Sequence, residues 1–261
     1  MIIYKKINYL KKKSPAMKNN YGIIIEARTG SKRFPSKILK KINNKTILEL
    51  LIDRLITKIP KKKILVATTK KAEDTLIIKI CKKKKIDFFL GSESNLINRI
   101  YSAAKLKKID NIIQITADNP LVNLDIMQNL IKIYFKKKLV FATNSFHRTF
   151  PIGSDIRIFK RSTLENNENK VPIKKREHTA FFFLKNFNKI RSFNLYAPKE
   201  LNRPDIRLTL DYPEDFVVLK KIFFKFKKSK YFNLKKIIKF LDENPKIKKI
   251  NSKYEKHFKI N

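Results

Sequence analysis

The chain has 261 residues, of which 43% are hydrophobic, so it is long and apolar enough for one α/β domain with a small appendage. Its formal net charge of +40 comes mainly from short Lys runs spread along the whole chain, which favours compositional bias and solvated element ends over a nucleic-acid-binding face. A single Cys excludes a disulfide framework, and no apolar stretch reaches the ~20 residues of a membrane span. We therefore expect a cytoplasmic protein with no membrane and no nucleic-acid partner.

The first twenty residues are basic, with scattered Ile and Tyr but without the continuous apolar stretch of a signal peptide. We expect residues 1–20 to form a disordered basic extension. Two alternatives stay open: translation starts at Met17, or the Lys cluster is a basic arm for a membrane or a nucleic acid.

From residue 23 to residue 143, short apolar stretches alternate with longer amphipathic stretches. The short stretches predict strands over 23–27, 64–68, 87–90, 111–116 and 139–143. The longer ones predict helices over 46–58, 72–83, 95–107 and 124–136, because their apolar residues recur at helical spacing. This alternation indicates βαβ units and a mostly parallel sheet, in which ligands bind beyond the carboxyl ends of the strands.

The pattern is less regular after residue 144. We expect strands over 156–159 and 192–197, a helix over 176–186, a buried strand over 207–211 and a helix that begins at Pro213. A last helix is expected over 231–240, and the polar residues beyond it are assigned no element. Cys81 falls on an apolar helical face, which favours a buried structural thiol over a nucleophile.

The first candidate site follows the first predicted strand. Residues 27–37 have the sequence A-R-T-G-S-K-R-F-P-S-K, a loop of small residues and cations. Small residues let backbone N–H groups approach phosphate oxygens, Arg binds them bidentately and Lys adds a point charge. We expect Arg28, Arg33 and Lys37 to contact a triphosphate, with further donors from Gly30 and Ser31. The spacing matches neither a Walker A loop nor a dinucleotide-binding fingerprint.

Two Asp residues each end a predicted strand. Asp118 lies in Q-I-T-A-D-N-P-L (114–121), and Asp211 lies in L-T-L-D-Y-P-E-D (208–215). A carboxylate at the end of a strand can hold Mg²⁺, a hard cation that prefers carboxylate and phosphate oxygens. Glu214 and Asp215 fall in the first turn of the following helix, where we expect them to cap it.

Together these motifs resemble those of the sugar cytidylyltransferases, above all the family of the spore coat polysaccharide biosynthesis protein F. The resemblance extends from the first strand to about residue 216. It implies a three-layer αβα, Rossmann-like nucleotide-diphospho-sugar transferase fold with a mostly parallel mixed sheet. It also implies Mg²⁺-dependent transfer of CMP from CTP to a sugar acid for surface polysaccharide, with release of pyrophosphate. By the same resemblance Asp118 and Asp211 are the metal ligands, and with Arg28 and Lys37 they form the expected catalytic set.

Weaker similarities cover the middle of the chain. The stretches 67–74 and 91–99 match those that line the base pocket of relatives, while 147–155 and the R-E-H at 176–178 match sugar-proximal motifs. The expected nucleotide-binding residues are Ala27, Arg28, Gly30, Ser31, Arg33, Lys37, Thr68, Gly91, Ser92 and Asn95, and the expected sugar-binding residues are Arg148, Gly153, Asp155, Arg176 and His178. For His178, a surface or interface histidine is an equal alternative. The chain departs from the family's usual residues at Glu26, Ser36 and Ala117.

The domain organisation follows from these motifs: residues 21–226 are expected to form a nucleotidyltransferase domain, and 227–261 a C-terminal helix with a basic tail. CTP and a sugar acid are the expected partners, and the sugar, the base and a homodimer stay open. One alternative is a nucleotidyltransferase for a sugar phosphate or another NTP. The other is a non-catalytic, nucleic-acid-associated protein on the same fold, which would have no use for Asp118 and Asp211.

Overall fold

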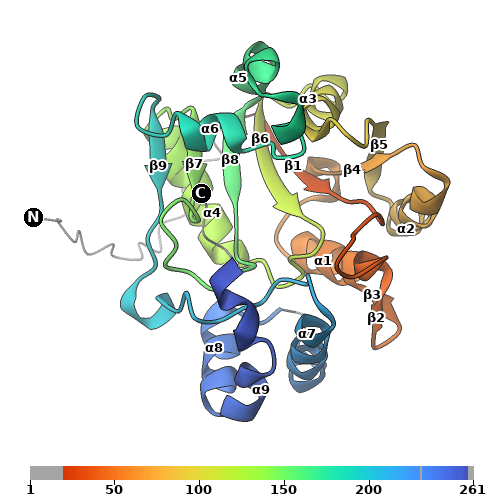
Figure 1. Ribbon diagram of the computed structural model, residues 1–261, viewed down its shortest axis with the longest axis vertical. Coiled ribbons are helices and arrows are strands. Elements are labelled where there is room, and N and C mark those ends of the chain that lie inside the picture. The colour runs from red at the N-terminus through yellow and green to blue at the C-terminus, as the bar shows by residue number, and fades with distance from the viewer. Residues whose placement is uncertain (1–19, 230, 258–261) are drawn as a thin grey trace, which may run out of the picture.

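The computed structural model describes residues 20–229 and 231–257, so most of the basic extension predicted over 1–20 lies outside the described residues. Within this part, seven strands form one sheet in the order β5-β4-β1-β6-β8-β7-β9 (Figure 1). Their bounds are β1 Tyr21–Glu26, β4 Ile64–Thr69, β5 Asp87–Gly91, β6 Asn111–Thr116, β7 Phe141–Thr143, β8 Arg157–Lys160 and β9 Ser192–Asn194. Among the seven strands of this sheet, β8 alone runs against its neighbours, which confirms the mostly parallel mixed sheet.

Helices cover both faces of the sheet, as the continuous burial of the residues in β1, β4 and β6 requires. On β1, Ile23 and Ile25 pack into the core that contains α1 (Ile47–Ile56), α2 (Thr75–Lys84) and α4 (Leu124–Lys136). Ile24 points to the opposite face, into the core that contains α3 (Leu96–Leu106), α5 (Arg161–Asn167) and α6 (Phe181–Lys185). The molecule is therefore the expected three-layer αβα sandwich, since successive strand residues point to opposite faces.

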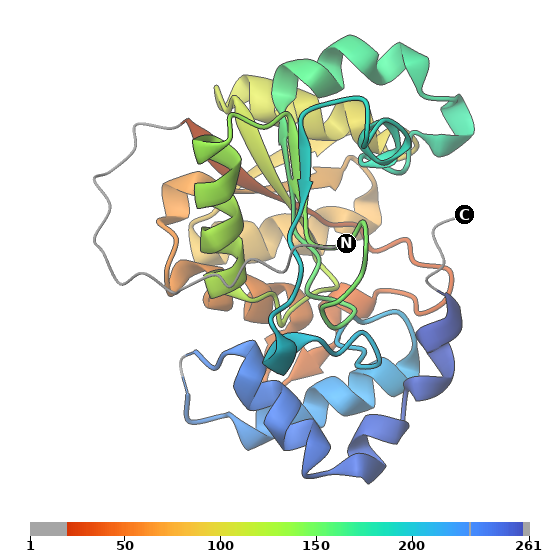
Figure 2. The same cartoon turned by 90° about the vertical axis from the view of Figure 1, so that its left-hand side faces the viewer.

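The C-terminal helices pack beneath the carboxyl edge of the sheet. Helices α7 (Pro213–Lys225), α8 (Leu234–Asp242) and α9 (Pro245–Lys249) lie together at the lower end of both views (Figures 1 and 2). Leu234 and Ile237 of α8 belong to the same apolar core as α1. In α1, Arg54 donates to the carbonyls of Val122 and Phe232 over 2.6 and 2.7 Å. The domain boundary predicted at residue 226 stays a prediction, and residues before and after it belong to one apolar core.

Helix starts follow local capping rules. Thr46 and Glu49 form a capping box at the start of α1, just after the short β2–β3 hairpin (Lys41–Ile42 and Lys45–Thr46). The side chains of Asn95 and Asn123 accept hydrogen bonds from backbone N–H groups at the starts of α3 and α4.

Cys81 on α2 is fully buried, as expected, and burial raises the pKa of its thiol to about 12. None of the helices in the described residues is long and apolar enough to cross a membrane.

Four predictions about the second half were wrong in detail. The segment 207–211 is not a strand: Arg207 forms one isolated bridge with Ile152, and the segment is buried because it crosses the end of the sheet. The helix expected over 176–186 is confined to α6, after the 3-10 turn Ile173–Lys175. The strand expected over 192–197 is limited to the three residues of β9. The helix expected over 231–240 is α8 and is not the last, because residues that were assigned no element form α9 and the 3-10 segment Ser252–His257.

Candidate active site

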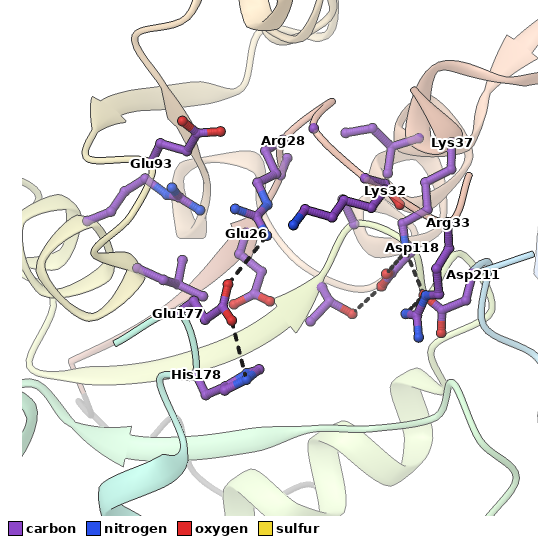
Figure 3. A pocket seen from close by; sticks show the side chains of 18 residues that line it. Glu26, Arg28, Lys32, Arg33, Lys37, Glu93, Asp118, Glu177, His178 and Asp211 are labelled. Atoms are coloured by element: carbon purple, nitrogen blue, oxygen red, sulfur yellow. Dashed lines mark hydrogen bonds and ion pairs between the residues drawn. The ribbon is translucent and has the colours of Figure 1, made fainter. Parts of the chain in front are cut away.

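The centre of the site is a lysine held between two aspartates. Lys37 Nζ lies 2.5 Å from Asp118 Oδ2 and 2.8 Å from Asp211 Oδ1 (Figure 3). Lys37 follows the loop after β1, Asp118 follows β6, and Asp211 precedes α7. Lys37 and Asp211 are 8% and 4% exposed, so the charges meet with little water between them. Although burial alone would lower the pKa of Lys37, the two carboxylates outweigh it and raise the pKa.

Asp211 is held by two further cations. Arg33 Nη2 lies 2.8 Å from Asp211 Oδ1, and Arg207 Nη2 donates to Asp211 Oδ2 over 2.8 Å. Burial would raise the pKa of the Asp211 carboxyl, but Lys37, Arg33 and Arg207 together hold it below its usual value. Asp211 is therefore kept as a carboxylate at the bottom of a cationic loop.

Asp118 is oriented by its own strand and by the neighbouring segment. Thr116 Oγ1 donates to Asp118 Oδ1 over 2.6 Å, and Asn119 Nδ2 donates to Thr116 Oγ1 over 2.8 Å. The N–H of Leu210 donates to the carbonyl oxygen of Asp118 over 2.9 Å, which joins the 207–211 segment to the end of β6. This bond brings the two Asp residues together although they lie far apart in the sequence.

The loop after β1 is fixed at both ends. At its start, the N–H and hydroxyl of Thr29 both donate to Asp74 Oδ1 over 2.8 Å, and Thr69 also donates to Asp74. At its end, Ser36 adopts a left-handed conformation with φ of 53°, and the 3-10 turn Lys37–Leu39 follows. The turn carries the Lys37 side chain back under the loop toward the two carboxylates.

A pocket of about 580 Å³ opens beside this centre (Figure 3). It brings together nine residues of the predicted set: Ala27, Arg28, Gly30, Ser31, Arg33, Lys37, Asp118, His178 and Asp211. The far wall carries Glu177, whose Oε2 lies 3.9 Å from Arg28 Nη2. Four cations of the loop line one wall, a charge arrangement suited to a polyphosphate.

The other predicted nucleotide-binding residues lie outside the lining of this pocket. Thr68 is fully buried in β4, and Gly91 ends β5 in close contact with Arg99. The carbonyl of Ser92 accepts a 2.6 Å bond from Arg99 Nη1, and Asn95 caps α3 while donating to Glu168 Oε1 over 2.6 Å. Contact of these four residues with a nucleotide remains a prediction.

The predicted sugar-binding residues fall in two places. Arg148 and Asp155 form a bidentate pair at 2.7 and 2.8 Å, and the Arg148 guanidinium outweighs burial to hold the pKa of Asp155 below its usual value. Near this pair Gly153 adopts a φ of 93°. In the other group, Arg176 Nε donates to the carbonyl of Val171 over 3.1 Å, and His178 lies exposed at the pocket rim.

Some residues of the site were missed. Arg207 is four positions before Asp211. In an extended segment this even spacing places both side chains on one face, which could have indicated from the sequence that they interact. Lys32, Glu93 and Thr116 also line the pocket. Glu26, which was noted as a departure without a role, accepts a hydrogen bond from the amide of Gln114 in the pocket floor.

Comparison with known proteins decides the family. A family model described as cytidylyltransferase matches residues 22–256, which is most of the chain. The chain belongs to the cytidylyltransferase family. The matched range includes the loop after β1, both aspartates and the C-terminal helices.

Three relatives place the chain within this family. The uncharacterized protein MJ1063 of Methanocaldococcus jannaschii is 35% identical over 235 residues, covering 88% of this chain and 93% of that protein. A solved cytidylyltransferase from Leptospira borgpetersenii has a TM-score of 0.83 at 34% identity, covering 88% of this chain and 97% of that chain. The spore coat polysaccharide biosynthesis protein SpsF of Bacillus subtilis is 24% identical over 233 residues, covering 87% of this chain and 96% of that protein.

Proposed function

We propose that the protein transfers CMP from CTP to a sugar acid and releases pyrophosphate, in the synthesis of a surface polysaccharide. The observation that carries this proposal is the Lys37 bridge between Asp118 and Asp211 beneath a cationic loop, in a chain of the cytidylyltransferase family. The sugar-acid part is supported by the motif resemblance and by similarity to a relative named for polysaccharide biosynthesis.

The loop residues supply the positive charge that the reaction needs. Arg28, Arg33 and Lys37 would bind the β- and γ-phosphates and stabilise the leaving pyrophosphate as its charge develops. A hydroxyl of the sugar acid attacks the α-phosphorus in line, so that a new O–P bond forms as the α–β anhydride breaks and the hydroxyl proton passes to water. Holding both reactants in this geometry is the main task of such a site.

Asp118 and Asp211 fit a Mg²⁺ site. Both place a carboxylate oxygen within 2.8 Å of Lys37 Nζ, so the two oxygens are close enough to share one cation. Mg²⁺ would replace the Lys37 ammonium between them and leave Lys37 to the phosphates. The described residues hold no group of three or more His, Cys, Asp and Glu side chains that could bind a metal. Mg²⁺ often takes one or two carboxylates and completes its shell with phosphate and water, so the proposed site needs no third protein ligand. Bound Mg²⁺ would neutralise charge on the α-phosphate.

Pyrophosphate release tests the proposal. Purified protein with Mg²⁺ is assayed with each of the four NTPs against Kdo, a panel of nonulosonic acids, and sugar phosphates. The proposal predicts release that requires both CTP and a sugar acid. Preference for another NTP or for a sugar phosphate would keep nucleotidyl transfer but overturn the substrate assignment. No release with any pair would overturn the function.

A further inference from the structure

The C-terminal segment 251–254 contacts the site through two sets of interactions, one from Asn251 and one from Tyr254, which adjoin where Tyr212 lies against Arg207. The first begins at Asn251, which follows α9 and is 3% exposed. Its side-chain amide donates to Asp215 Oδ1 over 2.9 Å and to the carbonyl of Arg207 over 3.1 Å. Both partners are almost completely buried, so this contact is shielded from water.

The first set ends on the Asp211 carboxylate. Asp215 accepts from Arg207 Nε over 2.8 Å, and Arg207 in turn donates to Asp211 Oδ2 over 2.8 Å. Asp215 Oδ2 also accepts the backbone N–H of Asp211 over 2.8 Å. Asn251 therefore fixes the group that orients both the backbone and the side chain of Asp211.

The second set is an aromatic stack that contacts Arg33 in the loop after β1. The rings of Tyr254 and Tyr212 stack with centroids 3.7 Å apart and planes 3° from parallel. The guanidinium carbon of Arg33 lies over the Tyr212 ring, 5.2 Å from its centroid, in a cation–π contact. Tyr254 is anchored in turn by Glu214, which accepts from its hydroxyl over 3.0 Å.

We infer that Asn251 and Tyr254 are positioning residues of the active site: Asn251 orients the Asp211 carboxylate through Asp215 and Arg207, and Tyr254 orients Arg33 through Tyr212. This inference rests on the proposed function for the roles of Asp211 and Arg33. Docking of α8 has its own apolar contacts, because Leu234 and Ile237 bury this helix in the main core. Both sets of contacts instead end on side chains that line the pocket.

The Tyr254 arm is tested by binding of inorganic pyrophosphate without metal, measured by calorimetry. Tyr254→Phe keeps the ring, whereas Tyr254→Leu keeps apolar bulk but removes the stack. We expect the Phe variant to bind like wild type and the Leu variant to bind about five- to ten-fold more weakly, the range of a lost cation–π arrangement. Phe224→Leu, on an exposed ring of α7, is the matched control and should bind normally.

Melting temperatures separate positioning from folding. Equal binding by the Leu and Phe variants would overturn the Tyr254 role. The role would also be overturned if Tyr254→Leu and Phe224→Leu both bind weakly and both melt at a lower temperature than wild type. Binding of pyrophosphate needs no sugar and no turnover, so this experiment tests the role of Tyr254 independently of the substrate assignment.

The role of Asn251 is tested by steady-state kinetics with CTP and the sugar acid preferred in the pyrophosphate assay. Asn251→Ala should lower kcat about ten-fold and leave the KM for CTP nearly unchanged, since Asp211 is expected to act mainly in the transition state. Lys249→Ala, on an exposed side chain at the end of α9, should match wild type. An unchanged kcat, or a raised KM alone, would overturn the Asn251 role. Inactive wild-type protein would instead overturn the proposed function.

Discussion

At the scale of single residues, Glu26 is unusual because it is an acid in the floor of a pocket whose loop wall is cationic. It ends β1 on the face shared with Ile24, where its carboxylate accepts from Gln114. Burial raises the pKa of Glu26, and the nearby Arg157 only partly opposes the shift. Folding therefore costs free energy whenever Glu26 must be ionised.

Glu26→Gln keeps the size of the side chain and removes its titration. Because the folded pKa lies above the usual 4.5, the contribution of Glu26 to stability is complete below that pH and is lost as the pH rises through the folded value. The melting temperature of wild type should therefore fall relative to Glu26→Gln as the pH rises above 4.5, and the two should converge in acid.

The control for this comparison is Glu243→Gln, at the exposed end of α8. It should shift the melting temperature little, and by a similar amount at every pH. A Glu26→Gln difference that does not vary with pH, or that grows in acid, would contradict the account.

The sequence predicted the chemistry of the central residues better than their contacts. Lys37, Asp118 and Asp211 stood out because each lies in its own motif, at a predicted strand end or loop. Their shared bridge joins residues 81 and 174 positions apart, which no local pattern encodes. Asn251 was missed for the same reason, since its partners Asp215 and Arg207 lie 36 and 44 positions away. Arg207 was missed although its partners Asp211 and Asp215 lie only four and eight positions away.

At the scale of elements, the segment 207–211 is placed by a close backbone crossing. Gly153 has a φ of 93°, and a Cβ at this position would lie 2.4 Å from the backbone nitrogen of Thr209. The N–H groups of Ile152 and Leu208 donate to neighbouring carbonyls of the two crossing segments. Gly153 is thus needed for packing, whatever its relation to a sugar.

Gly153→Ala should lower the free energy of unfolding by about 2–4 kcal/mol, because the added methyl combines backbone strain with a clash against main-chain atoms. Denaturant unfolding measures this directly. Gly30→Ala is the matched control for stability, since its Cβ would meet nothing closer than Glu93 Oε1 at 3.6 Å. Equal stabilities of the two variants would show that the crossing can relax.

The predicted elements were most accurate where periodicity and burial agree. The strands and helices of the first half were confirmed within a few residues. Each helix buries one regular apolar face, and the central strands are short apolar stretches buried on both faces. The stretch 207–211 has the apolar pattern of a strand, yet its burial comes from crossing the sheet end, with its hydrogen bonds going to Ile152 and Asp118. The polar pattern after residue 240 hid α9, whose start depends on Pro245 at its first turn.

At the scale of the whole molecule, the site lies where three distant parts of the chain meet at the carboxyl edge of the sheet. The loop after β1 supplies cations, β6 supplies Asp118, and the segment before α7 supplies Asp211. The C-terminal helices close this edge from below (Figure 2). The fold class followed from strand–helix alternation alone, whereas the enclosure of the site by the C-terminal residues did not.

The central claim is that Asp118 and Asp211 serve the transfer of CMP from CTP to a sugar acid. The most direct measurement follows CTP labelled at its α-phosphate, incubated with Mg²⁺ and the sugar acid preferred in the pyrophosphate assay. Wild type should place the label on the sugar acid. Asp118→Asn and Asp211→Asn, assayed well below the melting temperature of each variant, should lose transfer by at least about 10²-fold. Asp211→Asn should also melt at a lower temperature than wild type, because it leaves the buried Arg207 and Lys37 without one carboxylate. Near-normal transfer by both variants at saturating CTP and Mg²⁺ would contradict the account.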